Sequence, residues 1–101
     1  MAVEAIYVSS MSAWEVAMLA AKGRLRLTTD VVSWIRKSEA LPFISFVPVN
    51  NTIACGSVTL PESPPNDPAD RIIISTALSL GAALITKDRK IRDYGPAQAI
   101  W

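Results

Sequence analysis

Short apolar runs alternate with longer amphipathic segments along the chain, which predicts a regular succession of strands and helices. The runs rich in β-branched and aromatic residues predict four strands. These strands are residues 5–9 (AIYVS), 44–49 (ISFVPV), 83–86 (ALIT) and 97–101 (AQAIW). The segments between them predict helices at residues 12–22, 31–40, 51–58, 68–80 and 87–92.

Residues that start and stop helices support these boundaries. Ser12 is placed to cap the first helix, and Thr29 or Asp30 to cap the second. Asp67 followed by Pro68 is a strong helix start, because aspartate caps well and proline fits the first helical position. Gly81 is placed to end that helix in a left-handed conformation. Strands that alternate with helices, and that are continuously apolar, predict an open, mostly parallel α/β sheet.

Composition then limits the chemistry. The 101 residues, half of them hydrophobic, suit one domain over residues 1–101. The net charge of +1 does not indicate a class of binding partner. The chain has no histidine and one cysteine, Cys55, which excludes catalytic triads, zinc sites built on His or Cys₄, and an intramolecular disulfide. Any metal ligands must therefore be oxygens, which favour Mg²⁺, Mn²⁺ or Ca²⁺.

No targeting or membrane segment is expected. The first ten residues lack a basic region and contain Glu4. The longest apolar stretch, residues 72–85, is shorter than the ~20 residues of a spanning helix and contains polar residues. We therefore expect a soluble, cytoplasmic protein.

Three carboxylates, those of Glu15, Asp70 and Asp88, follow predicted strands or begin predicted helices. Such positions gather at the carboxyl edge of an open α/β sheet, where ligands bind. Clustered carboxylates repel one another and favour a divalent cation as partner. Each residue also has a purely structural interpretation. Ser12 and Glu15 have the spacing of a capping box, Asp70 would interact with the helix dipole, and Asp88 would cap a short helix.

Three ordered motifs resemble the VapC-type toxins of the PIN-domain nucleases. They are residues 9–17 (SSMSAWEVA) with 22–25 (KGRL), residues 67–77 (DPADRIIISTA), and residues 84–88 (LITKD). Tyr94-Gly95 and the terminal Trp101 fit the usual ending of that family. The resemblance covers essentially the whole chain, and it implies a PIN-like three-layer α/β/α fold.

The resemblance implies a Mg²⁺- or Mn²⁺-dependent ribonuclease that is the toxin of a toxin–antitoxin pair, with a cognate antitoxin as partner and a homodimer as the expected assembly. Glu15, Asp70 and Asp88 take the acidic active-site positions of the family, and Asp67 takes a helix-capping position. Asp93 would assist a second metal, and Thr86 would orient a metal-bound water. The basic residues Arg71, Lys87 and Arg89 would bind RNA phosphates; the alternative for the run at residues 87–92 is a solvated helix face. Trp14 and Trp34 are expected in the core or a dimer contact, and Cys55 is expected to be a small buried side chain.

The match departs from the family at the N-terminus, where the family has a strand carrying an aspartate, followed by a helix. We expect an N-terminally truncated PIN-like domain that lacks both, and Glu4 is not assigned the missing role. A start codon further upstream, a truncated remnant and a partner chain that fills the gap are the three explanations. Two further functions therefore compete with the ribonuclease: an inactive relic that binds an antitoxin or itself, and a plain structural domain whose acids cap helices.

Overall fold

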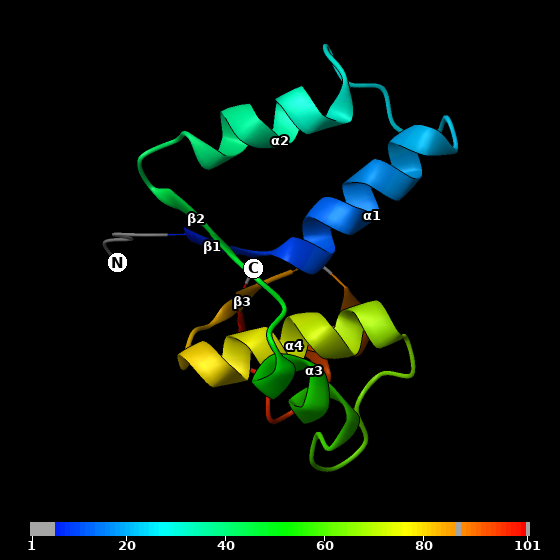
Figure 1. Ribbon diagram of the computed structural model, residues 1–101. Helices are drawn as coiled ribbons and strands as arrows, with labels where there is room; N and C mark the ends of the chain where they lie inside the picture. The colour runs from blue at the N-terminus through cyan, green and yellow to red at the C-terminus, as the bar shows by residue number, and fades with distance from the viewer. Residues whose placement is uncertain (1–5, 87, 101) are drawn as a thin grey trace. The chain divides into compact units, whose positions relative to one another are not determined.

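The structure is a computed structural model and describes residues 6–86 and 88–100. The chain divides into two compact units, Met1–Pro48 and Val49–Trp101. Each unit contains helices and one pair of strands (Figure 1).

The first unit pairs two strands that come from opposite ends of its sequence. Strand β1 (Ile6–Ser9) is followed by helices α1 (Ser10–Ala21) and α2 (Val31–Glu39) and then by strand β2 (Ile44–Val47). The strands β1 and β2 run parallel, with Ile6 opposite Ile44. Strand β2 ends directly before Pro48, as expected, because proline has no N–H to donate to a sheet. The predicted first residue of β1, Ala5, lies outside the described residues.

The start of α1 differs from the prediction. The N-cap is Ser9 and not Ser12: Ser9 has an extended backbone (φ −66°, ψ 139°), and its hydroxyl accepts a hydrogen bond of 3.1 Å from the Met11 amide. The strand therefore passes into the helix without an intervening turn. Ser12 lies inside the helix, and α1 has no acidic residue in its first turn. The predicted capping box between Ser12 and Glu15 is wrong for this reason.

The start of α2 agrees with the prediction. Asp30 is its N-cap, and the carboxylate accepts hydrogen bonds from the amide and the hydroxyl of Ser33, at 3.0 and 2.7 Å. The hydrogen bond from the Ser33 hydroxyl, followed by that from its amide, lowers the pKa of Asp30. The expected alternative cap, Thr29, donates its hydroxyl to Asp30.

The second unit contains helix α3 (Asn51–Val58), helix α4 (Pro68–Leu80), strand β3 (Leu84–Ile85), helix α5 (Arg89–Arg92) and strand β4 (Ala99–Ile100). The strands β3 and β4 are parallel, with Leu84 opposite Ala99. Both are shorter than predicted, because the chain leaves the ladder at either side of these pairs, although the Leu84 amide still donates to the Gln98 carbonyl at 2.7 Å. Lys87 and Trp101, the predicted ends of the last helix and strand, lie outside the described residues.

Both predicted ends of α4 are confirmed. Asp67 is the N-cap, and its carboxylate accepts hydrogen bonds from the amides of Ala69 and Asp70, at 2.8 and 3.4 Å. Gly81 is the C-cap, in the left-handed conformation (φ 62°, ψ 30°), which glycine adopts without steric cost.

The buried apolar side chains among the described residues all lie in the second unit. They are Ile53, Ile74, Ile91, Tyr94 and Ala97. Four of them form one cluster centred on Ile74, which is completely buried. Leu60 and Leu84 pack against this cluster. The core thus joins α4 to the C-terminal segment that contains α5 and Tyr94.

Two side chains expected in the interior are at the surface. Trp14 on α1 is 55% exposed, which contradicts a core position and leaves the alternative of a dimer contact as a prediction. Cys55 is exposed on α3, so its expected burial is wrong. The α3 residues that are buried are Ile53 and Ser57, four positions apart, and Cys55 lies between them on another face.

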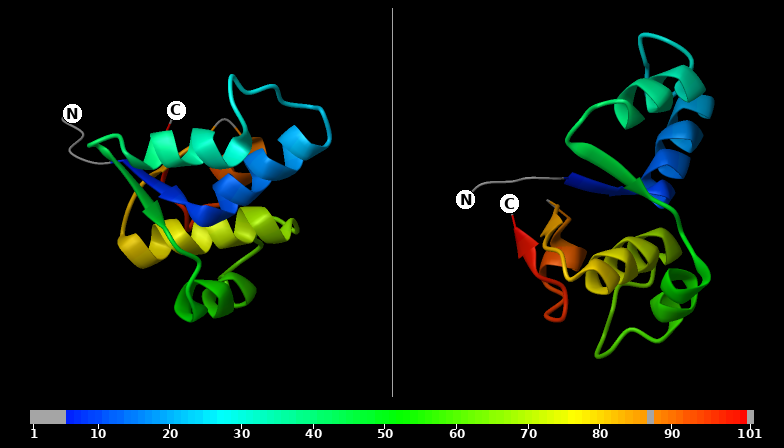
Figure 2. Two further views of the ribbon diagram at one scale, coloured as in Figure 1. Left: turned by 45° about the horizontal axis from the view of Figure 1, so that its top comes forward. Right: turned by 60° about the vertical axis from the view of Figure 1, so that its left-hand side comes forward.

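Helices α3 and α4 lie side by side (Figures 1 and 2) and approach closely at Gly56. A Cβ atom at Gly56 would come within 2.8 Å of the Ser75 hydroxyl. That hydroxyl is buried and donates a hydrogen bond of 2.8 Å to the Ile53 carbonyl. The missing side chain at Gly56 therefore allows α4 to bond directly to the backbone of α3.

We expect Gly56→Ala to lower the free energy of unfolding by about 1 kcal/mol. Alanine alone would stabilise the helix by about 1 kcal/mol relative to glycine. This gain is outweighed because the Ser75 hydroxyl must move, which strains the contact and breaks a buried hydrogen bond. Urea denaturation monitored by circular dichroism measures the change.

The matched control is Gly95→Ala, because a Cβ there meets the Glu62 carboxylate at an ordinary 3.5 Å and the backbone φ is not positive. The double variant Gly56→Ala/Ser75→Ala should be less destabilised than the sum of the single variants. Additive single effects would contradict the contact between Gly56 and Ser75.

The α/β class is confirmed, since helices alternate with strands and every strand pair in the described part of the chain is parallel. Within residues 6–86 and 88–100, no helix is long and apolar enough to cross a membrane.

Candidate functional site

Three aspartates of the second unit lie at the beginnings of its helices. Asp67 caps α4, Asp70 lies in the first turn of α4, and Asp88 caps α5. Asp70 is half-buried, and burial is the largest cause that raises the pKa of its carboxyl. The negative charges of Asp67 and Asp88 raise this pKa further, and the Lys90 ammonium opposes them. Two of the three predicted active-site acids, Asp70 and Asp88, are therefore brought within electrostatic reach of each other.

The raised pKa has a defined meaning for the energetics of Asp70. Its ionised form is disfavoured in the folded protein, so it takes up a proton at a higher pH than an ordinary aspartate. Above the raised pKa, the ionised carboxylate lowers the free energy of unfolding. This loss of stability disappears as the pH falls through the raised pKa and the carboxyl takes up its proton. A cation near Asp70 would offset this cost.

Asp88 is held by a local turn. Its amide donates to the Thr86 hydroxyl at 3.0 Å, and its own carboxylate accepts from the Lys90 amide at 2.9 Å. The predicted structural role of Asp88 as a helix cap is thus confirmed, and it uses one oxygen of an exposed carboxylate. The Thr86 hydroxyl orients the Asp88 backbone here, while its predicted role toward a water molecule remains a prediction.

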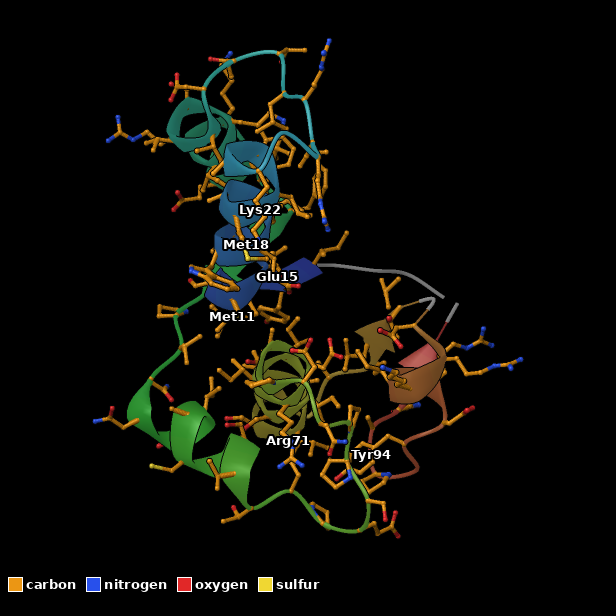
Figure 3. The ribbon with its side chains drawn as sticks, turned by 90° about the vertical axis from the view of Figure 1, so that its right-hand side faces the viewer. Met11, Glu15, Met18, Lys22, Arg71 and Tyr94 are labelled. Carbon is orange, nitrogen blue, oxygen red and sulfur yellow. The ribbon has the colours of Figure 1, made fainter. Side chains whose placement is uncertain are left out.

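Glu15 belongs to the first unit, on α1. Figure 3 shows it in a row along the helix with Met11, Met18 and Lys22, at spacings of three and four residues. Glu15 is half-buried between two methionines of this row. Its convergence with Asp70 and Asp88 remains a prediction.

Asp93, the predicted ligand of a second metal, is the C-cap of α5 and is exposed. Among residues 6–86 and 88–100, no group of three or more His, Cys, Asp or Glu side chains is placed to hold a metal ion. The donor set of the second unit nevertheless fits a hard cation, because it consists of carboxylate oxygens that repel one another around Asp70.

The predicted RNA-binding residues differ in their surroundings. The Arg71 Nε atom donates a hydrogen bond of 2.6 Å to the Pro65 carbonyl, so this guanidinium has a structural contact. Arg89 is exposed on α5, as are Lys90 and Arg92. Lys87 lies outside the described residues.

Two residues of the second unit make interactions that the sequence did not predict. The Lys90 ammonium lowers the pKa of Asp70. The only signal of this interaction in the sequence is the position of Lys90 two residues after Asp88. The Tyr94 hydroxyl donates a hydrogen bond of 2.6 Å to the Pro61 carbonyl, 33 residues away. Burial raises the pKa of Tyr94, the Glu62 carboxylate raises it further, and Arg71 opposes this. No local sequence pattern predicts a contact of this length.

Comparison with known proteins identifies the family of this chain. The family model described as PIN domain matches residues 1–95. The chain is 38% identical over 87 residues to Ribonuclease VapC22 of Mycobacterium tuberculosis (strain ATCC 25618 / H37Rv). This alignment includes 86% of the present chain and 65% of VapC22, so the chain covers less than two thirds of that relative. No solved structure gives a significant match.

Proposed function

Because this chain belongs to the PIN-domain family and resembles its VapC type, we propose that it is a metal-dependent endoribonuclease of the toxin type. Its reaction would be the hydrolysis of RNA phosphodiesters. The proposal extends to this chain what the name of its relative, a ribonuclease, says of VapC22.

The observation that carries the proposal is the placement of Asp70. Its half-buried carboxylate lies within electrostatic reach of Asp67 and Asp88, and this surrounding raises its pKa. Capping of α4 by Asp67 does not require a further carboxylate, that of Asp88, from another segment. The repulsion is the arrangement expected at a site that takes up a cation.

We propose that Asp70 and Asp88 hold Mg²⁺ or Mn²⁺ together with Glu15, and that Asp93 assists a second ion. Carboxylate oxygens are the ligands that these ions prefer. Such an ion, when bound, would supply Lewis acidity toward the phosphodiester and lower the pKa of the attacking water. Asp67 supports the site by capping α4, since its carboxylate fixes the amides of Ala69 and Asp70.

The RNA backbone would be bound by the cations around these acids. Arg89 is exposed on α5, directly after Asp88, and Arg71 directly follows Asp70. With Lys87 they would contact phosphates, which adds affinity without sequence preference. The other basic residues of α5 would add to the same field.

We further propose a cognate antitoxin and a second copy of this chain as partners, with the cytoplasm as the location. These follow from the family, and the exposed Trp14 on α1 supplies apolar surface for a contact. The two compact units would act as one domain over residues 1–101.

The proposal is tested by metal removal. The purified chain is incubated with labelled total RNA in Mn²⁺ or Mg²⁺, then with EDTA, and then with the metal restored. We expect discrete cleavage with either ion, none with EDTA, and recovery on restoration, because the carboxylates cannot activate water without a cation.

A folded chain that leaves RNA intact in both ions would contradict the nuclease proposal for this sequence. The alternative, a catalytically inactive module that binds an antitoxin or itself, would then be preferred. Sedimentation of the chain alone and with the product of an adjacent gene distinguishes self-association from antitoxin binding.

A further inference from the structure

The loop that leads into α4 is held at both of its ends by side chains. This proline loop (residues 60–66) contains three prolines and follows α3. Near its start, the Pro61 carbonyl accepts the hydrogen bond of 2.6 Å from the Tyr94 hydroxyl. Near its end, the Pro65 carbonyl accepts the bond of 2.6 Å from Arg71 Nε. Figure 3 places Arg71 and Tyr94 in the same part of the second unit.

The bond made by Tyr94 joins the two segments that carry the aspartates. Pro61 precedes Asp67 and Asp70 by less than ten residues, and Tyr94 follows Asp88 by six. The bond therefore links the start of α4 to the region of α5 at a point close to both acids along the chain.

The environment of Tyr94 separates the role of its hydroxyl from that of its ring. The side chain is only 3% exposed and packs in the cluster of Ile74, Ile91 and Ala97. The ring is held by that packing whether or not the hydroxyl is present. A change that removes only the oxygen should therefore release the Pro61 end of the proline loop and leave the core filled.

The backbone next to Pro61 adopts an unfavourable conformation. Glu62 has a φ of 59°, in the left-handed region that residues other than glycine rarely adopt. Such a conformation persists when its surroundings enforce it. The hydrogen bonds that the Pro61 and Pro65 carbonyls accept hold the loop on either side of Glu62.

The bond from Tyr94 to Pro61 adds a hydrogen bond to the cluster of Ile74, Ile91, Tyr94 and Ala97, which already joins α4 to the region of α5. We propose that Tyr94 is a positioning residue, whose bond to the Pro61 carbonyl holds the segments of Asp70 and Asp88 together for a divalent cation. This inference rests on the proposed metal-dependent function. It assigns to Tyr94 a role in preparing the site and no contact with RNA or metal.

The test compares Tyr94→Phe with the unsubstituted chain by isothermal titration with Mn²⁺. We expect the dissociation constant for Mn²⁺ to rise about 10-fold, the lower end of what the loss of an outer-shell partner costs a metal site. Tyr7→Phe is the matched control, because Tyr7 is 52% exposed on β1 and loses the same atom. Its Mn²⁺ affinity should be unchanged.

A second variant tests the other end of the proline loop. Arg71→Lys keeps the positive charge beside Asp70 but replaces the Nε atom that donates to Pro65. We expect weaker Mn²⁺ binding here too. Circular dichroism on each variant establishes that it is folded before titration.

The outcomes separate the two proposals. If the unsubstituted chain binds Mn²⁺ and folded Tyr94→Phe binds it equally well, the positioning role is wrong and the metal-dependent function stands. If the unsubstituted chain does not bind Mn²⁺, the proposed function fails and the role of Tyr94 fails with it. A lower melting temperature with an unchanged dissociation constant would identify Tyr94 as purely structural.

Discussion

Asp70→Asn is expected to lower RNA cleavage by this chain about 100-fold or more, because even outer-shell partners of a metal site are worth 10–100-fold. Asparagine preserves the shape of the side chain and removes its negative charge. Asp70 is half-buried and lies within electrostatic reach of Asp67 and Asp88, so its charge is the one that a divalent cation would offset most directly.

The fold should tolerate this substitution, so a loss of RNA cleavage would report on the catalytic role of Asp70 and not on unfolding. Removing the charge removes two costs that raise the pKa of Asp70: the cost of burying a charged group and the repulsion by the neighbouring carboxylates. It also removes a favourable interaction with the dipole of α4, worth about 0.3–1 kcal/mol. These effects have opposite signs, and we expect a small net change in the melting temperature.

Asp67→Asn is the matched control for Asp70→Asn. It removes the same charge from the same helix start, three residues earlier, and asparagine caps helices about as well as aspartate. We expect it to retain most of the cleavage. Cleavage of labelled RNA, measured as initial rates in Mn²⁺, compares the two variants. Equal activity of Asp70→Asn and the unsubstituted chain would remove Asp70 from the catalytic machinery.

Ile74→Ala is expected to destabilise the protein by about 2–5 kcal/mol, the range for removing a large buried aliphatic side chain. Ile74 is 0% exposed and lies at the centre of the cluster with Ile91, Tyr94 and Ala97. A domain of this size has a total stability of about 5–15 kcal/mol. Each kcal/mol corresponds to about 4–8 °C in melting temperature, so the variant should melt roughly 10 °C lower or more.

Leu78→Ala provides the control on the same helix. Leu78 lies one turn after Ile74 and is 41% exposed, so its truncation removes less buried surface and leaves no closed cavity. We expect a loss of about 1 kcal/mol or less. Differential scanning calorimetry of the two variants measures the difference. Similar melting temperatures for both would contradict the position of the core.

The loss of Ile74 should also affect the acidic site. The cluster joins α4, which carries Asp70, to Ile91 of α5, the helix that Asp88 caps. A cavity there would let α5 move relative to α4 and weaken the grouping of the acids. The core and the candidate site thus depend on the same contacts.

Much of this protein was determined by its sequence alone, because helix ends and short strands depend on neighbouring residues. Asp30 and Asp67 cap the helices that they were predicted to cap, and Gly81 ends α4 in the left-handed conformation. These features need only a side chain and a backbone group a few residues apart. The three ordered motifs, at residues 9–17 with 22–25, 67–77 and 84–88, were likewise enough to indicate the family.

The tertiary structure alone decided the features that join residues distant in sequence. The bond from Tyr94 to Pro61 spans 33 residues, and the bond from Ser75 to Ile53 spans 22. Even the shift of the α1 cap from Ser12 to Ser9 follows from the extended backbone where β1 ends beside β2. Periodicity identifies the face of a helix that is apolar, but only packing decides what covers it, as the exposed Cys55 and Trp14 illustrate. The burial of Asp70, which is the largest cause of its raised pKa, and the proximity of Asp88, which raises it further, belong to the same class, because the proximity requires α4 and α5 to meet across one core.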